Sequence, residues 1–263
     1  MKKIKLLAAL ALTAGLLASC GGGDQPAESG VSTAKSSSTP RSSKFVAQWS
    51  KDPTKHVDPG CDHEGKDVEV CLNSSGERET KIDKIAHTFG AKGQKHEEEG
   101  KTGYWTAECS VCHSKAIILD ALEYTKMDGT NKDDTGATIK LASPNGSYVE
   151  YEFTMPEAAT SADIAVYGWV DYWHDGRNDN QDRGFFNGSD PNVGVNINGK
   201  DLTITNKKTY EQMGMKAGEN GNGSFTLCEM GAFGAIEAGP TKLTYTRLGS
   251  YNLNITEIWI IYK

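Results

Sequence analysis

The residues with the clearest capacity for chemistry are the cysteines and histidines between Pro53 and Ala116. Cys109 and Cys112 are separated by two residues, so one tight turn could place two thiolates at adjacent corners of a tetrahedral zinc site. This stretch is polar, and a small segment with few aliphatic residues usually needs a metal or disulfides to fold. It holds all of the following potential ligands: Cys61, Cys71, Cys109, Cys112, His56, His63, His87, His96 and His113.

A known pattern surrounds the cysteine pair. His87-Thr88-Phe89 followed by Cys109-Ser-Val-Cys112 resembles the short zinc-ribbon-like repeats of bacterial surface proteins, in which a His-Thr-aromatic step precedes a Cys-x-x-Cys pair. Those repeats often carry a cysteine two residues before the histidine, where this chain has Ile85. The resemblance therefore implies a structural zinc site in which an upstream residue supplies the fourth ligand. The expected ligands are Cys109, Cys112, His87 and Cys71, with Cys61 or His63 as alternatives to Cys71.

Two other interpretations of the cysteines stay open. In an oxidising compartment, the cysteines could form the disulfides Cys61–Cys71 and Cys109–Cys112. Cys109-x-x-Cys112-His113 is also the attachment string of c-type haem, with His113 as the axial ligand. The hydrophilic flanks of the string make the haem interpretation the least favoured. Under all three hypotheses the site is structural rather than catalytic.

The N-terminus indicates export. Lys2, Lys3 and Lys5 precede an apolar stretch over residues 6–17, which is typical of a secretory signal peptide. The stretch ends in Leu-Ala-Ser-Cys, which resembles the lipobox of bacterial lipoproteins and implies lipidation of Cys20. We therefore expect a signal peptide over residues 1–19 and a chain anchored to the bacterial cell membrane on its extracytoplasmic side.

The segment that follows is expected to be a tether. Residues 20–52 are rich in Gly, Ser, Thr and Pro, and such a composition buries too little apolar surface to fold. The chain has a formal net charge of −7 and no basic stripe, which argues against a nucleic-acid partner.

Residues 117–263 carry the pattern of a β domain. Val149, Tyr151 and Phe153 alternate with polar residues, which predicts a half-buried strand, and Asn198-Gly199 predicts a hairpin. Short strands joined by Gly/Asn/Asp loops, without helical periodicity, predict a β-sandwich. We expect this mainly β domain to follow a small Cys/His-rich, zinc-ribbon-like domain over residues 53–116.

The domain contains, in this order, the segments LDALEYTKMDGTN, SYVEYEFTMPEAATSADIAVYG, VNINGK and NITEIWI. Their order resembles that of carbohydrate-binding modules of families 6 and 35, in which the corresponding segments are the opening strand, the next two strands, a hairpin and the closing strand. The resemblance implies a galactose-binding-like jelly roll with a glycan site in the loops at one end. The residues that it implies for glycan contact are Tyr210, Tyr251, Asn252 and Asn254. Trp173 is a further candidate, and it lies beside the insertion 174–192, which is a feature of this chain itself.

Calcium binding is a weaker implication of the same resemblance. Family members often hold a structural ion between the first and last strands, where this chain has Glu123 and Thr256, with Glu257 next to it. Zinc and calcium are thus the expected cofactors, and haem c is disfavoured. Cys228 is expected to be a buried thiol.

No catalytic pattern stands out, because the sequence lacks Gly-x-Ser-x-Gly and a recognisable nucleophile–base pair. We expect a non-catalytic, membrane-anchored surface lipoprotein that binds a glycan through loops at one end of a jelly roll. The alternative is a structural or protein-interaction module of a cell-surface assembly without a sugar site. The partner would then be a cell-surface protein in place of a carbohydrate.

Overall fold

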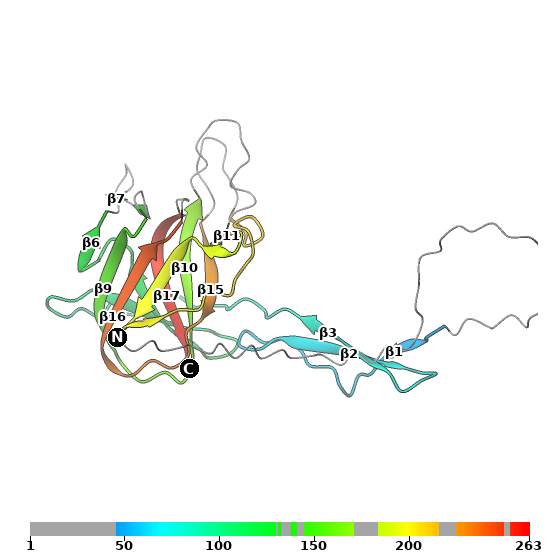
Figure 1. Cartoon of the computed structure of the whole chain (residues 1–263). Coiled ribbons are helices and arrows are strands. Elements are labelled where there is room, and N and C mark those ends of the chain that lie inside the picture. Colours follow the sequence, from blue (N-terminus) through cyan, green and yellow to red (C-terminus); the bar gives the residue numbers. More distant parts are fainter. Residues whose placement is uncertain are drawn as a thin grey trace, which may run out of the picture. The chain divides into compact units, whose positions relative to one another are not determined.

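The computed structural model describes residues 46–129, 131–132, 138–140, 145–170, 184–215, 225–249 and 253–263, which form strands and loops without a helix. They belong to two compact units, Met1–Ala86 and His87–Lys263 (Figure 1). The expected signal peptide, Cys20 and most of the expected tether lie outside the described residues. Among the described residues, no helix is long and apolar enough to cross a membrane.

The first unit contains a three-stranded antiparallel sheet in the order β1-β2-β3, formed by Trp49–Lys51, Gly65–Cys71 and Glu77–Ile82 (Figure 1). Its described apolar side chains give it a very small core, because only Cys61, Val68 and Cys71 are buried. The side chains of β3 are almost all polar and exposed. Hydrogen bonds and ion pairs between neighbouring strands therefore carry much of the cohesion of this sheet.

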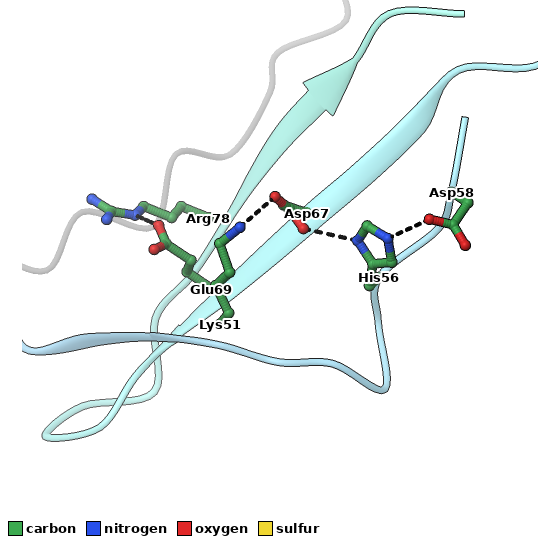
Figure 2. Close-up of polar contacts among 6 residues, drawn as sticks. All are labelled: Lys51, His56, Asp58, Asp67, Glu69 and Arg78. Carbon is green, nitrogen blue, oxygen red and sulfur yellow. Dashed lines mark hydrogen bonds and ion pairs between the residues drawn. The ribbon is translucent and has the colours of Figure 1, made fainter. Parts of the chain in front are cut away.

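One polar chain runs across this sheet (Figure 2). Lys51 Nζ bonds Asp67 at 2.8 Å, the other carboxylate oxygen of Asp67 lies 2.8 Å from His56 Nδ1, and His56 Nε2 lies 2.9 Å from Asp58. Hydrogen bonds to Asp58 and Asp67 raise the pKa of His56 above its ordinary value of 6.5. Because these groups are solvent-exposed, the network contributes only modestly to stability.

The second unit is a sandwich of two antiparallel sheets (Figure 1). The first sheet has the order β15-β10-β17-β5-β4, with Thr226–Ala232, Ala162–Val170, Leu253–Tyr262, Lys115–Asp120 and Tyr104–Glu108. Two short strands, β8 (Ile139–Lys140) and β7 (Asn131–Lys132), extend it beside β17. The second sheet has the order β14-β13-β16-β9-β6, with Lys200–Asp201, Val193–Ile197, Gly239–Arg247, Tyr148–Met155 and Lys126–Asp128. A separate hairpin pairs β11 (Phe186–Asn187) with β12 (Asp190–Pro191).

The main core lies between the two sheets. Val149, Tyr151 and Phe153 of β9 belong to the same buried cluster as Ile258 and Ile260 of β17. Alternate residues of each strand point into this cluster, as the period-two sequence pattern requires. The predicted jelly-roll β-sandwich is confirmed.

The domain boundary differs from the one expected from the sequence. The segment 87–116 belongs to the sandwich, because β4 and β5 pair with each other and β5 pairs with β17. The Cys109–Cys112 motif is therefore a turn between two strands of the large sheet rather than part of a separate domain over 53–116. The strand β4 has only five residues, YWTAE, which is too short for a clear periodic signal.

A loop segment covers the edge of β4. The backbone N–H groups of Gly90, Gly93 and His96 donate to the carbonyls of Glu108, Thr106 and Tyr104 at 3.3, 2.8 and 2.8 Å. The same segment crosses the outer face of the sheet, where the Phe89 ring packs 5.0 Å from the ring of Trp259. This face holds a second apolar cluster of buried Ala107, Ala116, Ile118, Ala165, Trp259 and Ile261. The segment 88–96 thus closes one edge of the sheet and covers part of its face.

Candidate metal centre and ligand groove

The turn between β4 and β5 fixes the two cysteines of the motif. The Cys109 N–H donates to the Ser114 carbonyl at 2.9 Å, and the His113 N–H donates to the Cys109 carbonyl at 2.9 Å. His113 adopts a φ of 58°, a left-handed conformation that is uncommon for a residue other than glycine. The turn is therefore tight enough to hold two sulfur atoms near one point.

His87 meets these sulfur atoms. Its Nδ1 lies 3.4 Å from Cys112 Sγ, and the ligand atoms of His87, Cys109 and Cys112 lie within 4.8 Å of one another. Zinc binds sulfur at about 2.3 Å and imidazole nitrogen at about 2.0–2.1 Å, so ligand atoms around one tetrahedral ion lie roughly 3.5–4 Å apart. The spacing is compatible with a zinc ion, and the structure brings these three predicted ligands together.

The surroundings of Cys109 favour a thiolate. Burial by itself raises the pKa of the Cys109 thiol, but hydrogen bonds from the backbone N–H groups of Cys112, Val111 and Thr88 and from the His87 side chain lower the pKa to about 6. The Thr88 N–H lies 3.4 Å from Cys109 Sγ, and Cys112 Sγ is hydrogen-bonded to Ser114 Oγ at 3.2 Å. Metals bind the deprotonated form, so this nest of donors prepares the site for a cation.

The upstream ligand candidates lie in the first unit. Cys61 Sγ lies 3.7 Å from the carbonyl oxygen of Ala86, the residue that precedes His87 in the chain. Cys71 lies at the far end of β2, about 20 Å along the strand from Gly65, where its thiol donates to Asn73 Oδ1 at 3.1 Å. Cys61 is therefore the cysteine beside Ala86, whereas Cys71, the expected fourth ligand, lies at the far end of β2. His63 bonds Asp62 and the Asp58 carbonyl instead.

The Cys61–Cys71 disulfide and the haem interpretation do not fit the described geometry. No disulfide links the described cysteines, and β2 separates Cys61 from Cys71 by more than a disulfide can span. The Cys109 side chain is fully buried, which leaves no room for a haem thioether. The His113 ring is exposed and its Nδ1 lies 2.8 Å from Glu108 Oε1. As predicted, Cys228 is buried, and burial raises the pKa of its thiol to about 12.

The glycan residues expected from the sequence are not brought together among the described residues. Tyr210 is 1% exposed and packs edge-on against Phe185, with ring centroids 6.0 Å apart, inside the main core. It cannot stack on a sugar, so its expected role is wrong. The physical reason is that the apolar ring is buried in the core and packs against other side chains there. Asn254 in β17 is also 1% exposed. Tyr251, Asn252, Trp173 and residues 174–183 of the insertion lie outside the described residues.

The expected calcium ligands are engaged by lysines. Glu123 bonds Lys95 at 2.6 Å, while Glu257 pairs with Lys92 and accepts a hydrogen bond from the Trp259 indole at 2.7 Å. In the described part of the chain, no group of three or more carboxylates forms around either glutamate. The expectation of a calcium site there has no geometric support.

The second sheet carries a groove that the sequence did not reveal. It has a volume of about 380 Å³ and lies over Gly194, with Asn196, Asp201 and Thr246 as polar lining. Its apolar lining comprises Phe186, Pro191, Val193, Val195, Leu202, Ile204 and Leu248. These residues come from separate segments, so no local motif could mark the site. Gly194, a strand position without a side chain between two valines, was the one sequence feature that could have indicated the groove.

The groove has the composition of a small-ligand site. Its volume falls within the range of about 300–1,000 Å³ that such sites occupy, and apolar walls with a few polar groups are typical of them. Asn196 Nδ2 donates to Asp201 Oδ1 at 2.7 Å, which holds both side chains in place. A side chain at Gly194 would fill the floor, since its Cβ would lie 3.2 Å from Leu248 Cδ1.

Comparison with known proteins gives only distant likenesses. No family model and no curated protein matches the sequence. A carbohydrate-binding module of family 36 from a xylanase of a Trinervitermes trinervoides hindgut metagenome is similar, with 15% identity, a TM-score of 0.35 and coverage of 55% of this chain and 95% of that one. A family 6 module from a laminarinase of Zobellia galactanivorans has 14% identity, a TM-score of 0.35 and coverage of 56% and 98%.

A third similar structure is much longer than the matched region. The Podospora anserina β-(1,4)-mannanase, which combines a glycoside hydrolase family 26 domain with a family 35 module, shows 11% identity and a TM-score of 0.36. The match covers 56% of this chain and 28% of the mannanase chain. What these proteins bind or cleave is a property of those proteins.

Proposed function

We propose that this chain is a non-catalytic surface lipoprotein whose jelly roll binds a glycan in the groove of the second sheet. The groove itself is the observation that supports this proposal. Phe186 offers an aromatic surface for the apolar face of a pyranose ring, while Asn196, Asp201 and Thr246 offer hydrogen-bonding groups for its hydroxyls. The proposal replaces the loop site expected from the sequence with a site on the sheet.

The lining favours binding over hydrolysis. Glycosidases use a pair of carboxylates on either side of the scissile bond. The groove has one, Asp201, and its oxygen accepts a hydrogen bond from Asn196. We therefore assign the groove a recognition role.

A glycan-array screen followed by calorimetry tests the groove. Gly194→Leu should fill the floor and Phe186→Ala should remove the aromatic wall, and each should weaken binding at least tenfold. Phe225→Ala is the matched control, because Phe225 is 48% exposed and does not line the groove. If the wild-type chain binds no glycan above background, the alternative of a protein-interaction module is favoured instead.

We further propose that a structural zinc ion is held by His87, Cys109, Cys112 and Cys61. The first three ligands already lie within bonding reach of one ion. Among the upstream candidates, Cys61 is the cysteine whose thiol lies beside the carbonyl of Ala86, the residue that directly precedes His87 in the chain. Four protein ligands would leave no open coordination position, which is the arrangement of structural zinc sites.

Metal analysis of freshly purified protein tests the zinc proposal. We expect one zinc per chain in the wild type and loss of zinc in Cys112→Ser and Cys61→Ser. Cys71→Ser is the matched control, since Cys71 is also buried but bonds Asn73. A wild-type chain without metal would contradict the proposal, and zinc loss only in Cys71→Ser would restore Cys71 as the fourth ligand.

We also propose that the chain is anchored by a lipid on Cys20. The proposal rests on the sequence LLASC after an apolar export segment. Detergent phase partition of cells that express Cys20→Ala should move the protein from the detergent phase to the aqueous phase. Retention in the detergent phase would mean that some other feature anchors the chain.

A further inference from the structure

The second nitrogen of the His87 ring points away from the cysteines. The His87 side chain is 3% exposed, and its Nε2 atom has no hydrogen-bond partner within the described structure. Its other ring nitrogen, Nδ1, faces Cys112 Sγ at 3.4 Å, and the ring stacks on Phe89 with centroids 5.3 Å apart. A buried polar atom without a partner is costly, so a nearby acceptor that could approach it matters.

Such an acceptor lies on β15, an edge strand of the first sheet. Glu229 Oε1 is 3.8 Å from His87 Nε2, a distance that a small rotation of the carboxylate would shorten to a hydrogen bond. Glu229 belongs to β15, where its neighbours Cys228 and Met230 point into the main core. Alternation along the strand therefore places the Glu229 side chain on the outer face, where His87 lies.

The backbone of Glu229 is held firmly. Glu229 pairs with Ala165 of β10, and its carbonyl accepts a hydrogen bond from Asn206 Nδ2 at 2.6 Å. The carboxylate itself is 41% exposed and lies on the side of the strand that faces the ring. A firmly held strand thus presents a carboxylate acceptor to the ring.

We propose that Glu229 is a positioning residue of the metal centre: its carboxylate accepts the Nε2–H of His87 and so turns the Nδ1 lone pair toward the metal. The proposal rests on the proposed zinc site. A neutral imidazole has one donor and one acceptor nitrogen, so an acceptor at Nε2 fixes the tautomer that can bind zinc through Nδ1. A carboxylate in this place also makes the ligand nitrogen more basic.

Chelator competition on the full zinc-loaded chain tests this assignment. Removal of such a carboxylate partner typically weakens metal binding by about 10–100-fold, and we expect that loss for Glu229→Leu. Glu229→Gln keeps an acceptor oxygen without the charge and should lie between the wild type and Glu229→Leu. Glu152→Leu is the control, because Glu152 is an exposed strand residue of the other sheet.

The outcomes separate the two proposals. A wild-type chain that holds no zinc contradicts the metal centre itself. Zinc affinity in Glu229→Leu equal to that of the wild type overturns the role of Glu229 while leaving the metal centre intact. The zinc-free forms of the wild type and Glu229→Leu should unfold at the same temperature. The role of Glu229 would also be overturned if Glu229→Leu lowered the unfolding temperature equally with and without zinc and left the NMR shifts of the His87 ring nitrogens unchanged.

Discussion

At the scale of single residues, Tyr210 shows how a plausible binding residue can be a core residue. Its ring is part of the main cluster between the sheets, and its exposed fraction is 1%. We therefore expect Tyr210→Ala to lower the free energy of unfolding by about 3–5 kcal/mol, the usual cost of removing a buried ring. Urea denaturation measures this change. Exposed Phe225→Ala should cost far less, and equal costs for both would contradict the burial of Tyr210.

His56 makes a pH-dependent prediction for the first unit. Hydrogen bonds to Asp58 and Asp67 raise the pKa of its ring above 6.5, so the folded state binds a proton more tightly than the unfolded state. The resulting stabilisation is present below the unfolded pKa and is lost as pH rises through the folded pKa. An NMR titration of the ring should give a raised midpoint that falls in Asp58→Asn and Asp67→Asn. A midpoint at 6.5 in the wild type would show that the network in Figure 2 does not form in solution.

The proximity of side chains could be predicted from the sequence where spacing itself constrains geometry. Two cysteines in a tight turn must lie together, so the closeness of Cys109 and Cys112 could be expected without a structure. The choice between Cys61 and Cys71 depends on which end of β2 lies near Ala86, and no local pattern contains that information. The same holds for Glu229, which reaches His87 only because β15 belongs to the same sheet as the turn.

At the scale of elements, the pairing of β10 with β17 depends on one glycine. The register shifts between Tyr167 and Gly168, and a Cβ at Gly168 would lie 2.3 Å from the Asn254 carbonyl oxygen. Gly168→Ala must therefore push two backbones apart, and overpacking of this kind typically costs about 1–3 kcal/mol. Thermal unfolding measures the loss. Gly90→Ala should be nearly neutral, since nothing lies within 4 Å of its Cβ position, and an equally mild Gly168→Ala would contradict the close approach.

Elements with a long alternating pattern were predictable. The strand at 148–155 and the hairpin at Asn198-Gly199 occur as expected, and both hairpin residues have positive φ angles of 51° and 84°. The short strand β4 was not predictable, because five residues give too little periodicity. Its stability comes from pairing with β5, a contact between segments that the cysteine motif separates.

At the scale of the whole molecule, the unequal cores of the two units predict unequal autonomy. The large buried cluster lies entirely within His87–Lys263, so a fragment of these residues should fold alone with a cooperative transition and a near-UV circular dichroism signal. Its zinc affinity should match that of full-length Cys61→Ser, because both lack the same thiol. A fragment without tertiary signal, or one that binds zinc as tightly as the full chain, would contradict this division of roles.

The fold class was predictable, whereas the domain boundary was not. Strand alternation and turn residues are local signals, and they indicated a sandwich correctly. The boundary depends on whether the segment before Ile117 finds a place in the sheet. The hydrogen bonds of β4 and of the segment 88–96 provide that place.

Covering of the β4 edge by the segment 88–96 has a consequence for metal-depleted protein. That segment directly follows His87, a proposed zinc ligand, so loss of the zinc would loosen it and expose the unpaired backbone carbonyls of Tyr104, Thr106 and Glu108. Bare edge strands act as templates for other chains, and zinc starvation should therefore promote self-association rather than simple unfolding. Light scattering after chelation should rise well below the unfolding temperature, and a solution that stays clear until the sandwich melts would show that the edge remains shielded.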